Sequence, residues 1–260
     1  MQVVGIDFSG ARDAARRIWI ASGVVAGSKL KVIDCIPAAE LPRASCGQPF
    51  VALTSFIEGL PTESVIGIDA PFGLPAGVTH AASWRELVES FPADYADADS
   101  FRATCLGSAG GRELRRETDA AARTPFCAYN LRLYRQTYHV LRDVLSPLVT
   151  TGGVSVAPMQ ERSAGRRLVV EVCPASTLKN HGLYVPYKGR RLRSARGRIL
   201  NRLVRQERLS VPPAVAARVL GDAGGDALDS IVAAAAARRA ARSTPTPPGT
   251  AWSLEGFVYV

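Results

Sequence analysis

The sequence predicts an α/β protein built on a mixed sheet, and three observations support this prediction. Two apolar strands, residues 2–7 and 64–69, end in the same Gly-Ile-Asp sequence. Two further strands after the first copy are expected to form an antiparallel meander with it. A helical stretch then leads to the second copy, which we expect to lie beside the first strand.

Local patterns justify the meander and its connecting helix. Residues 17–25 are rich in β-branched and aromatic side chains, which are typical of strands. A Gly-Ser pair at 27–28 predicts a tight hairpin turn, and residues 30–35 alternate between apolar and polar side chains. Residues 50–60 place their apolar side chains along one helical face. These patterns predict three strands followed by a crossover helix.

Residues 79–150 break this rhythm and predict a mostly helical insertion over the carboxyl edge of the sheet. Helices are expected over residues 84–91 and 130–148, and Pro147 is expected to end the second one. The stretch between these helices is polar and punctuated by glycines. We therefore predict a single domain over residues 1–260 that carries the insertion within it.

After the insertion the chain returns to the predicted sheet. Residues 168–174 form an apolar strand that contains Glu171, and residues 225–242 predict an alanine-rich helix. Residues 243–248 indicate a turn-rich connector, and residues 257–260 a short closing strand. Strands and helices thus alternate to the end of the chain, as expected for an α/β protein.

The amino-acid composition is that of an ordinary globular protein, and the cysteines are typical of a reducing compartment. The 260 residues are 47% hydrophobic and 21% charged, and a chain of this length buries a substantial core. No apolar run is long enough to cross a bilayer, and no basic stretch precedes the first apolar strand, so we expect a cytoplasmic protein without membrane contact. Five scattered cysteines and three isolated histidines favour reduced thiols over a disulfide framework or a zinc site.

The net charge of +9 points to a polyanionic partner. Only four of the 32 basic residues are lysines, and residues 188–208 hold nine basic side chains against one acid. A bias of base composition towards arginine and a solvated helix face are the alternatives. Guanidinium groups suit bidentate contacts with phosphate, so we expect nucleic acid as the partner. The residues expected to contact its backbone are Arg190, Arg191, Arg193, Arg196 and Arg198.

Four aspartates are candidates for a metal site. Asp7 and Asp69 end the two Gly-Ile-Asp strands, while Asp226 and Asp229 lie three residues apart on one face of the alanine-rich helix. Carboxylates gathered from distant parts of a chain repel one another unless a cation holds them together. Their oxygen atoms are the ligands that hard cations prefer, so we predict a site for Mg²⁺ or Mn²⁺. Glu171 is a further candidate, as a fifth ligand or a base.

Each of these carboxylates also has a structural interpretation. Asp7 and Asp69 precede turn-forming residues, so either can accept hydrogen bonds from backbone amides. Asp226 can cap the alanine-rich helix, and Asp229 suits the first turn because of the helix dipole. Glu171 needs a partner if its face of the strand is buried. The joint pattern favours a shared site, since the predicted fold brings the four aspartates to one edge of the sheet.

Several segments together resemble one family, the uncharacterised family of predicted ribonuclease H-like nucleases. They are residues 5–11, 68–75, 171–175, 225–230 and 255–257. The resemblance implies a ribonuclease H-like core with a metal-dependent nuclease site. The order of the carboxylates is also similar to that of the Holliday-junction resolvases of this superfamily, in which an acid ends the first strand, another ends the fourth, and a pair lies on the last core helix. Asp7, Asp69, Asp226 and Asp229 take those places, and Asp69 replaces a longer glutamate.

The expected function is therefore hydrolysis of a phosphodiester with one or two Mg²⁺ or Mn²⁺ ions, in which Glu171 or Asp229 orients water. Two alternatives stay open. One is a phosphotransferase or ATPase of the related actin-like superfold, because residues 5–10 also resemble a phosphate-facing loop. The other is a nucleic-acid-binding protein without catalysis. A melting temperature that rises with Mg²⁺ or Mn²⁺, and no longer does so after Asp7→Asn, would favour the metal-dependent enzyme.

Overall fold

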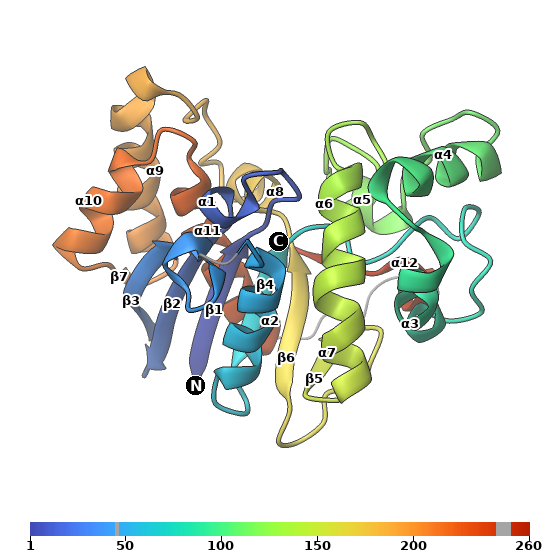
Figure 1. Ribbon diagram of the computed structural model, residues 1–260. Coiled ribbons are helices and arrows are strands. Elements are labelled where there is room, and N and C mark those ends of the chain that lie inside the picture. The colour runs from blue at the N-terminus through green and yellow to red at the C-terminus, as the bar shows by residue number, and fades with distance from the viewer. Residues whose placement is uncertain (45–46, 243–250) are drawn as a thin grey trace.

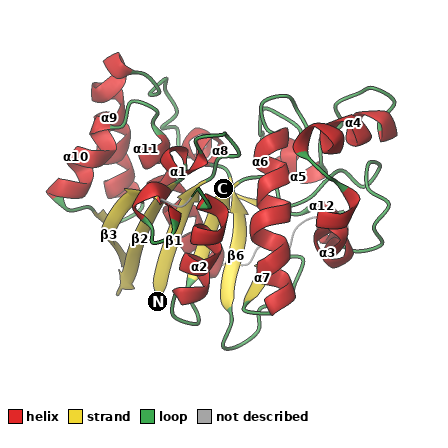
Figure 2. Cartoon of the chain, viewed as in Figure 1, coloured by secondary structure: helices red, strands yellow, loops and turns green. Residues whose placement is uncertain are grey.

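A computed structural model describes residues 1–44, 47–242 and 251–260, which form an α/β fold around one mixed sheet (Figures 1 and 2). The strands are β1 (Gln2–Asp7), β2 (Trp19–Ala26), β3 (Lys29–Pro37), β4 (Val65–Asp69), β5 (Val154–Ala157), β6 (Arg167–Val172), β7 (Leu209–Ser210) and β8 (Val258–Tyr259). Their order is β5-β6-β4-β1-β2-β3-β7, and β8 pairs with β6. The pairs β1–β2 and β2–β3 are antiparallel and the others parallel. The predicted mixed sheet, its meander and the place of β4 beside β1 are confirmed.

Helices cover both faces of this sheet (Figure 1). They are α1 (Ala14–Arg17), η1 (Ala38–Glu40), α2 (Pro49–Gly59), α3 (Trp84–Asp94), α4 (Ala98–Ser108), α5 (Glu117–Ala121), α6 (Tyr134–His139), η3 (Val140–Leu145), α7 (Ser146–Thr151), α8 (Pro174–Asn180), η4 (Arg190–Leu192), α9 (Arg193–Gln206), α10 (Pro213–Gly221), α11 (Asp226–Arg242) and α12 (Trp252–Glu255). Helix α2 and the continuous helix α6–η3–α7 pack on one face, and α11 packs on the other. Within the described residues, no helix has both the length and the apolarity to span a membrane.

The central strands are mostly apolar up to their carboxyl ends, and both of their faces are buried. Val4 and Ile6 of β1 belong to the core that includes Leu53 of α2, whereas Val3 belongs to the core around α11. Successive side chains of a strand point to opposite faces, so each strand supplies both cores.

The glycine of each Gly-Ile-Asp sequence lets α11 lie close against the sheet. A Cβ atom at Gly5 would lie 2.1 Å from the backbone N of Ala234, and one at Gly67 would lie 2.9 Å from the carbonyl O of Ala233. Only glycine in the strands and small residues in the helix allow this approach. The repeated glycine and the alanine-rich helix are therefore two halves of one contact, which brings the start of α11 to the carboxyl ends of β1 and β4.

The segment between β4 and β5 is mostly helical, as predicted, since it contains α3, α4, α5 and the helix α6–η3–α7. Its status as an insertion in a single domain stays a prediction. Helix α4 was not predicted; Asp97 and Ser100 form a capping box at its start. Strand β5 was not predicted either, because its four residues give too short a pattern.

The predicted end of the second insertion helix at Pro147 is wrong. The helix continues to Thr151, and the turn before the proline, η3, is π-helical. Proline has no N–H, and its ring clashes with the carbonyl four residues earlier in a regular helix, here that of Asp143. Residue 143 lies in the wider π-helical turn, which accommodates the proline without ending the helix. The predicted connector 243–248 lies outside the described residues.

Candidate metal centre

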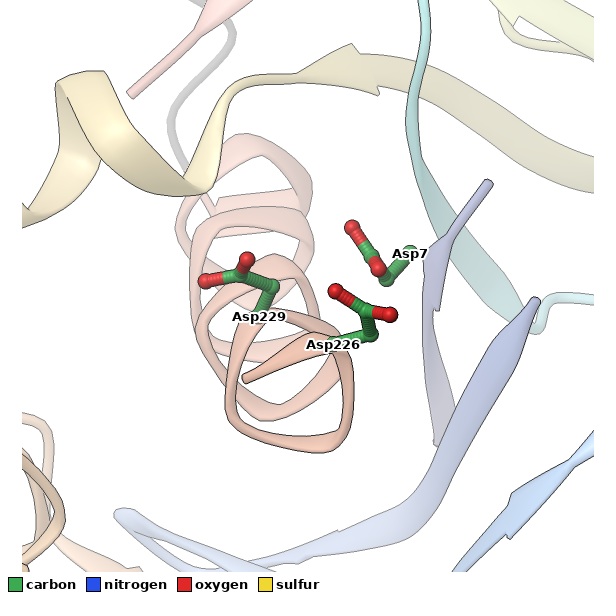
Figure 3. Close-up of side chains that lie close together, drawn as sticks. All are labelled: Asp7, Asp226 and Asp229. Atoms are coloured by element: carbon green, nitrogen blue, oxygen red, sulfur yellow. The ribbon is translucent and has the colours of Figure 1, made fainter. Parts of the chain in front are cut away.

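Three of the predicted aspartates meet at the carboxyl end of β1 (Figure 3). One carboxylate oxygen from each of Asp7, Asp226 and Asp229 lies within 4.8 Å of the other two. Asp7 ends β1, and Asp226 and Asp229 occupy the first turn of α11. Asp7 is 8% exposed and Asp229 is 3% exposed. We call these three residues the acidic cluster.

Asp69 lies next to the acidic cluster but outside that group of three. It is the register partner of Asp7 on the parallel strand β4. Asp7 and Asp69 each follow their glycine by two residues, so both side chains point to the α11 face of the sheet. Burial and then the negative charge of Asp229 raise the pKa of Asp69 to about 8. Asp69 is therefore electrostatically linked to the carboxyl groups of the acidic cluster.

Burial and mutual repulsion dominate the electrostatics of the acidic cluster. Burial, followed by the charges of Asp229 and Asp69, raises the pKa of Asp7 well above its usual value. Burial also raises the pKa of Asp229, although the charge of Lys188 opposes this rise. A cation placed among these carboxylates would offset their mutual repulsion.

Lys188 supplies a positive charge to the cluster. Its Nζ lies 2.8 Å from Oδ2 of Asp229 and 3.3 Å from Oδ1 of Asp226. Burial opposes its charged form, but Asp229 and Asp7 raise the pKa of Lys188 above its usual range. The neighbouring Tyr187 donates a hydrogen bond from its hydroxyl to Oδ1 of Asp229 at 2.6 Å. One carboxylate oxygen of Asp229 therefore accepts a hydrogen bond from Tyr187, and the other pairs with the ammonium group of Lys188.

Neither Lys188 nor Tyr187 was predicted as part of the site. Lys188 was counted only in the basic run of residues 188–208, although it is one of four lysines in a chain dominated by arginine. The rarity of lysine in this chain is only a weak indication that Lys188 belongs to a site. Nothing in the sequence spacing indicates that Lys188 lies against α11. A Cβ atom at Gly225 would lie 2.9 Å from the ring of Tyr187, so this glycine makes room for the contact.

The start of α11 is capped by Asp222. Its Oδ2 accepts a hydrogen bond from the N–H of Ala227 at 2.9 Å, and its Oδ1 accepts one from Gly224 at 3.0 Å. In the described structure the Asp226 carboxylate accepts no backbone hydrogen bond at this terminus and instead pairs with Lys188. The interpretation of Asp226 as the cap is therefore wrong, and its carboxylate is available to the acidic cluster.

Glu171 does not point towards the acidic cluster. In the β4–β6 register it pairs with Ile68, one position before Asp69, so its side chain lies on the opposite face of the sheet. There its two oxygens accept hydrogen bonds from Arg116 at 2.5 and 2.9 Å, and Oε2 also accepts one from the N–H of Phe72 at 2.8 Å. Arg116 in turn pairs with Asp119 at 2.9 Å. We call Arg116, Asp119 and Glu171 the Arg116 network. The prediction of Glu171 as a ligand or base beside the aspartates is therefore wrong.

The predicted nucleic-acid contacts also need one correction. Arg190, Arg191, Arg193 and Arg198 are exposed on η4 and α9, as expected for phosphate-binding residues. Arg196 is 1% exposed, and its guanidinium donates to the carbonyls of Tyr187, Gly189 and Leu220 at 2.8, 2.9 and 3.0 Å. Two of those carbonyls flank Lys188. Arg196 thus fixes the segment that carries Lys188 and does not reach the surface.

The residues of the acidic cluster suit a divalent cation. All donors are carboxylate oxygens, the ligand type that Mg²⁺, Mn²⁺ and Ca²⁺ prefer. The ammonium group of Lys188 lies between Asp226 and Asp229 at 3.3 and 2.8 Å, so a positive charge already lies beside these two carboxylates. Comparisons with protein-family models, with curated proteins and with solved structures found no match to this chain.

Proposed function

We propose that the protein is a metal-dependent nuclease that hydrolyses phosphodiester bonds at the acidic cluster. The observation that carries this proposal is the convergence of three carboxylates from residues 7, 226 and 229, with Asp69 beside them, in a desolvated setting. Buried like charges are costly for folding, so such a cluster indicates a bound ligand more than a structural role.

The topology supports a ribonuclease H-like fold. A meander of β1, β2 and β3 is followed by a crossover helix and by β4, which lies parallel to β1 on its other side. An acid ends β1, another ends β4, and a pair three residues apart begins α11. This order of elements and acids is the one that the family resemblance implies.

In this proposal Asp7, Asp226 and Asp229 hold Mg²⁺ or Mn²⁺, and Asp69 adds its charge from the neighbouring strand. A divalent ion, when bound, polarises a phosphoryl oxygen and makes water a better nucleophile. Tyr187 keeps Asp229 oriented through its hydrogen bond to Oδ1. The side chain of Lys188 is 53% exposed, so its ammonium can turn to a substrate phosphate when a divalent ion balances the carboxylates.

Cleavage assays with single-stranded and duplex RNA and DNA in Mg²⁺ or Mn²⁺ test this function. We expect the wild-type protein to cut at least one of these substrates, and Asp226→Asn to lose activity by about 10²-fold or more. Asp94→Asn is the matched control, because this exposed aspartate lies on α3, outside the acidic cluster. Absence of cleavage with every substrate, or equal activity in Asp226→Asn and the control, would contradict the proposal.

The exposed arginines of η4 and α9 are proposed to bind the nucleic-acid backbone. Each phosphate contact on duplex contributes about −0.9 to the slope of log affinity against log salt. Replacement of Arg191, Arg193 and Arg198 by alanine should therefore flatten that slope by roughly 2–3 units. The loss should not depend on base sequence, since phosphate contacts carry no sequence information. An unchanged salt slope would mean that these arginines form a solvated surface and do not contact the nucleic-acid backbone.

A further inference from the structure

A groove of about 880 Å³ lies between the start of α2 and the helix α6–η3–α7. Figure 1 shows these helices side by side in front of the sheet. One end of the groove is formed by Gly10, Ala11 and Arg12, in the loop that leaves β1 directly after the acidic cluster. We call this cavity the arginine groove. The proposed function assigns it no role.

The arginine groove begins at the same edge of the sheet as the acidic cluster. Gln136 of α6 donates a side-chain hydrogen bond to the backbone carbonyl of Asp69. A Cβ atom at Gly10 would lie 2.3 Å from the carbonyl O of Arg135, so the loop after β1 touches the backbone of α6. These two contacts fix the start of α6 against the ends of β1 and β4. Gly10 lines the groove and follows Asp7 by three residues, so the groove reaches the edge of the sheet that carries the acidic cluster.

The charges along the groove favour an anionic occupant. Arg12, Arg135 and Arg142 line it, and the one acid among its described lining residues is Asp143. Asp143 is already engaged, because its Oδ2 lies 2.7 Å from Nδ1 of His139. Arg12 is exposed, and neither Arg12 nor Arg142 forms an ion pair with any described residue. The guanidinium of Arg142 lies over the ring of Tyr138, 5.5 Å from its centroid, and has no carboxylate partner among the described residues. Neither positive charge is therefore balanced by a described acid within the groove, which favours a phosphate there.

The floor of the groove is apolar and aromatic. The rings of Phe50 and His139 are stacked, with centroids 4.6 Å apart and an angle of 21° between their planes. Both side chains are partly exposed and line the groove. A positively charged groove with aromatic rings suits a single strand, because an unpaired base can stack on a ring while its phosphate meets an arginine. The bases of a duplex are already stacked on each other and gain nothing from these rings.

We propose that the arginine groove binds a single-stranded segment of the nucleic acid whose phosphodiester lies at the acidic cluster. Arg12, Arg135 and Arg142 contact the phosphates of that segment, and a base stacks on the Phe50–His139 pair. This inference rests on the proposed function and narrows its substrate to nucleic acid with an unpaired strand.

Fluorescence anisotropy in EDTA tests the groove without cleavage, using a labelled 20-nucleotide single strand and a blunt duplex of equal length. Arg12→Ala/Arg142→Ala should weaken binding of the single strand several-fold and flatten its salt slope by about 1.4 units, since each contact on a single strand contributes about −0.7. Binding of the duplex should change much less.

The matched control is Arg162→Ala/Arg166→Ala, which removes two exposed arginines from the connection between β5 and β6 at the opposite edge of the sheet. Circular dichroism should show the same fold in both variants. Equal salt slopes in the groove variant and the control, or equal losses for single strand and duplex, would overturn the proposal for the groove alone. A wild-type protein that binds neither oligonucleotide would overturn the proposed function as well.

Discussion

Two groups of buried carboxylates lie near the carboxyl ends of the central strands, on opposite faces of the sheet. In the Arg116 network, a 1% exposed guanidinium pairs with both Glu171 and Asp119. In the acidic cluster three carboxylates face one another, and their cation is the half-exposed Lys188. The first group sets one buried guanidinium against two carboxylates, and the second sets one half-exposed ammonium against three.

This difference separates a structural role from a functional one. The Arg116 network joins β6 to the start of α5, and Arg116 also donates a hydrogen bond to the carbonyl of Glu255 at 3.0 Å in α12. It therefore ties the helical segment and the end of the chain to the sheet. The acidic cluster contacts the segment of Tyr187 and Lys188 through side-chain bonds, and burial raises the pKa of Asp7 and Asp229 within it. Removing a charge should consequently have opposite effects on stability in the two groups.

The largest expected effect is the loss of Arg116. Arg116→Met leaves Glu171 and Asp119 buried without a cation, and breaking a buried pair in this way costs about 3–5 kcal/mol. Urea unfolding at pH 7 measures the change in the free energy of unfolding. A loss below about 1 kcal/mol would mean that the network is not the structural tie described above.

Neutralising Asp7 should have the opposite sign. Asp7→Asn removes one of the repelling charges, so in the absence of metal the free energy of unfolding should rise by about 0.5–2 kcal/mol. The same variant should lose nuclease activity. A less stable Asp7→Asn protein in EDTA would show that the carboxylates of the acidic cluster do not repel one another.

The pH dependence of stability sharpens the contrast further. The folded state raises the pKa of Asp69 from 3.8 to about 8, so it binds this proton more tightly than the unfolded chain does. The stabilisation is complete below about pH 4 and is lost as the pH rises through 8. In EDTA, the melting temperature of Asp69→Asn minus that of the wild type should increase between pH 5 and pH 9. A constant difference would contradict the raised pKa.

The smallest expected effect on stability is that of removing the ammonium group of Lys188 from the acidic cluster. Lys188→Met removes a partner of Asp226 and Asp229, but the lysine side chain is 53% exposed. Water screens the exposed ammonium although the side chain of Asp229 is 4% exposed, so we expect the loss of this ammonium to cost less than the loss of the fully buried Arg116. Thermal unfolding should thus show a far smaller loss than for Arg116→Met. Comparable losses would mean that Lys188 is a structural counter-ion, like Arg116.

The sequence alone was sufficient to predict the structural elements that repeat or that have a clear hydrophobic period. The two Gly-Ile-Asp strands, the meander and the alanine-rich helix were predicted, and with them the meeting of Asp7, Asp226 and Asp229. The close packing of Gly5 and Gly67 against α11 was not predicted, because it joins residues more than 160 positions apart in the sequence.

The errors concern register and partners, which a single sequence does not encode locally. Glu171 was placed with the aspartates because a buried glutamate needs a partner, but a difference of one position in register puts its side chain on the other face. Arg196 is one of nine basic residues in its run, and its helical position alone separates it from its exposed neighbours. Lys188 was assigned to the phosphate-binding run because nothing in the sequence connects it to α11.

The most direct measurement is the melting temperature of the protein during titration with Mn²⁺. We predict a rise for the wild type that reaches about 5–10 °C at 100 times the Kd, because a ligand that binds only the folded state stabilises it. Glu171→Gln should show the same rise from its own baseline, and Asp7→Asn should show none. A wild-type protein that does not respond to Mn²⁺, or an equal rise in Asp7→Asn, would contradict the assignment of the acidic cluster as a metal site.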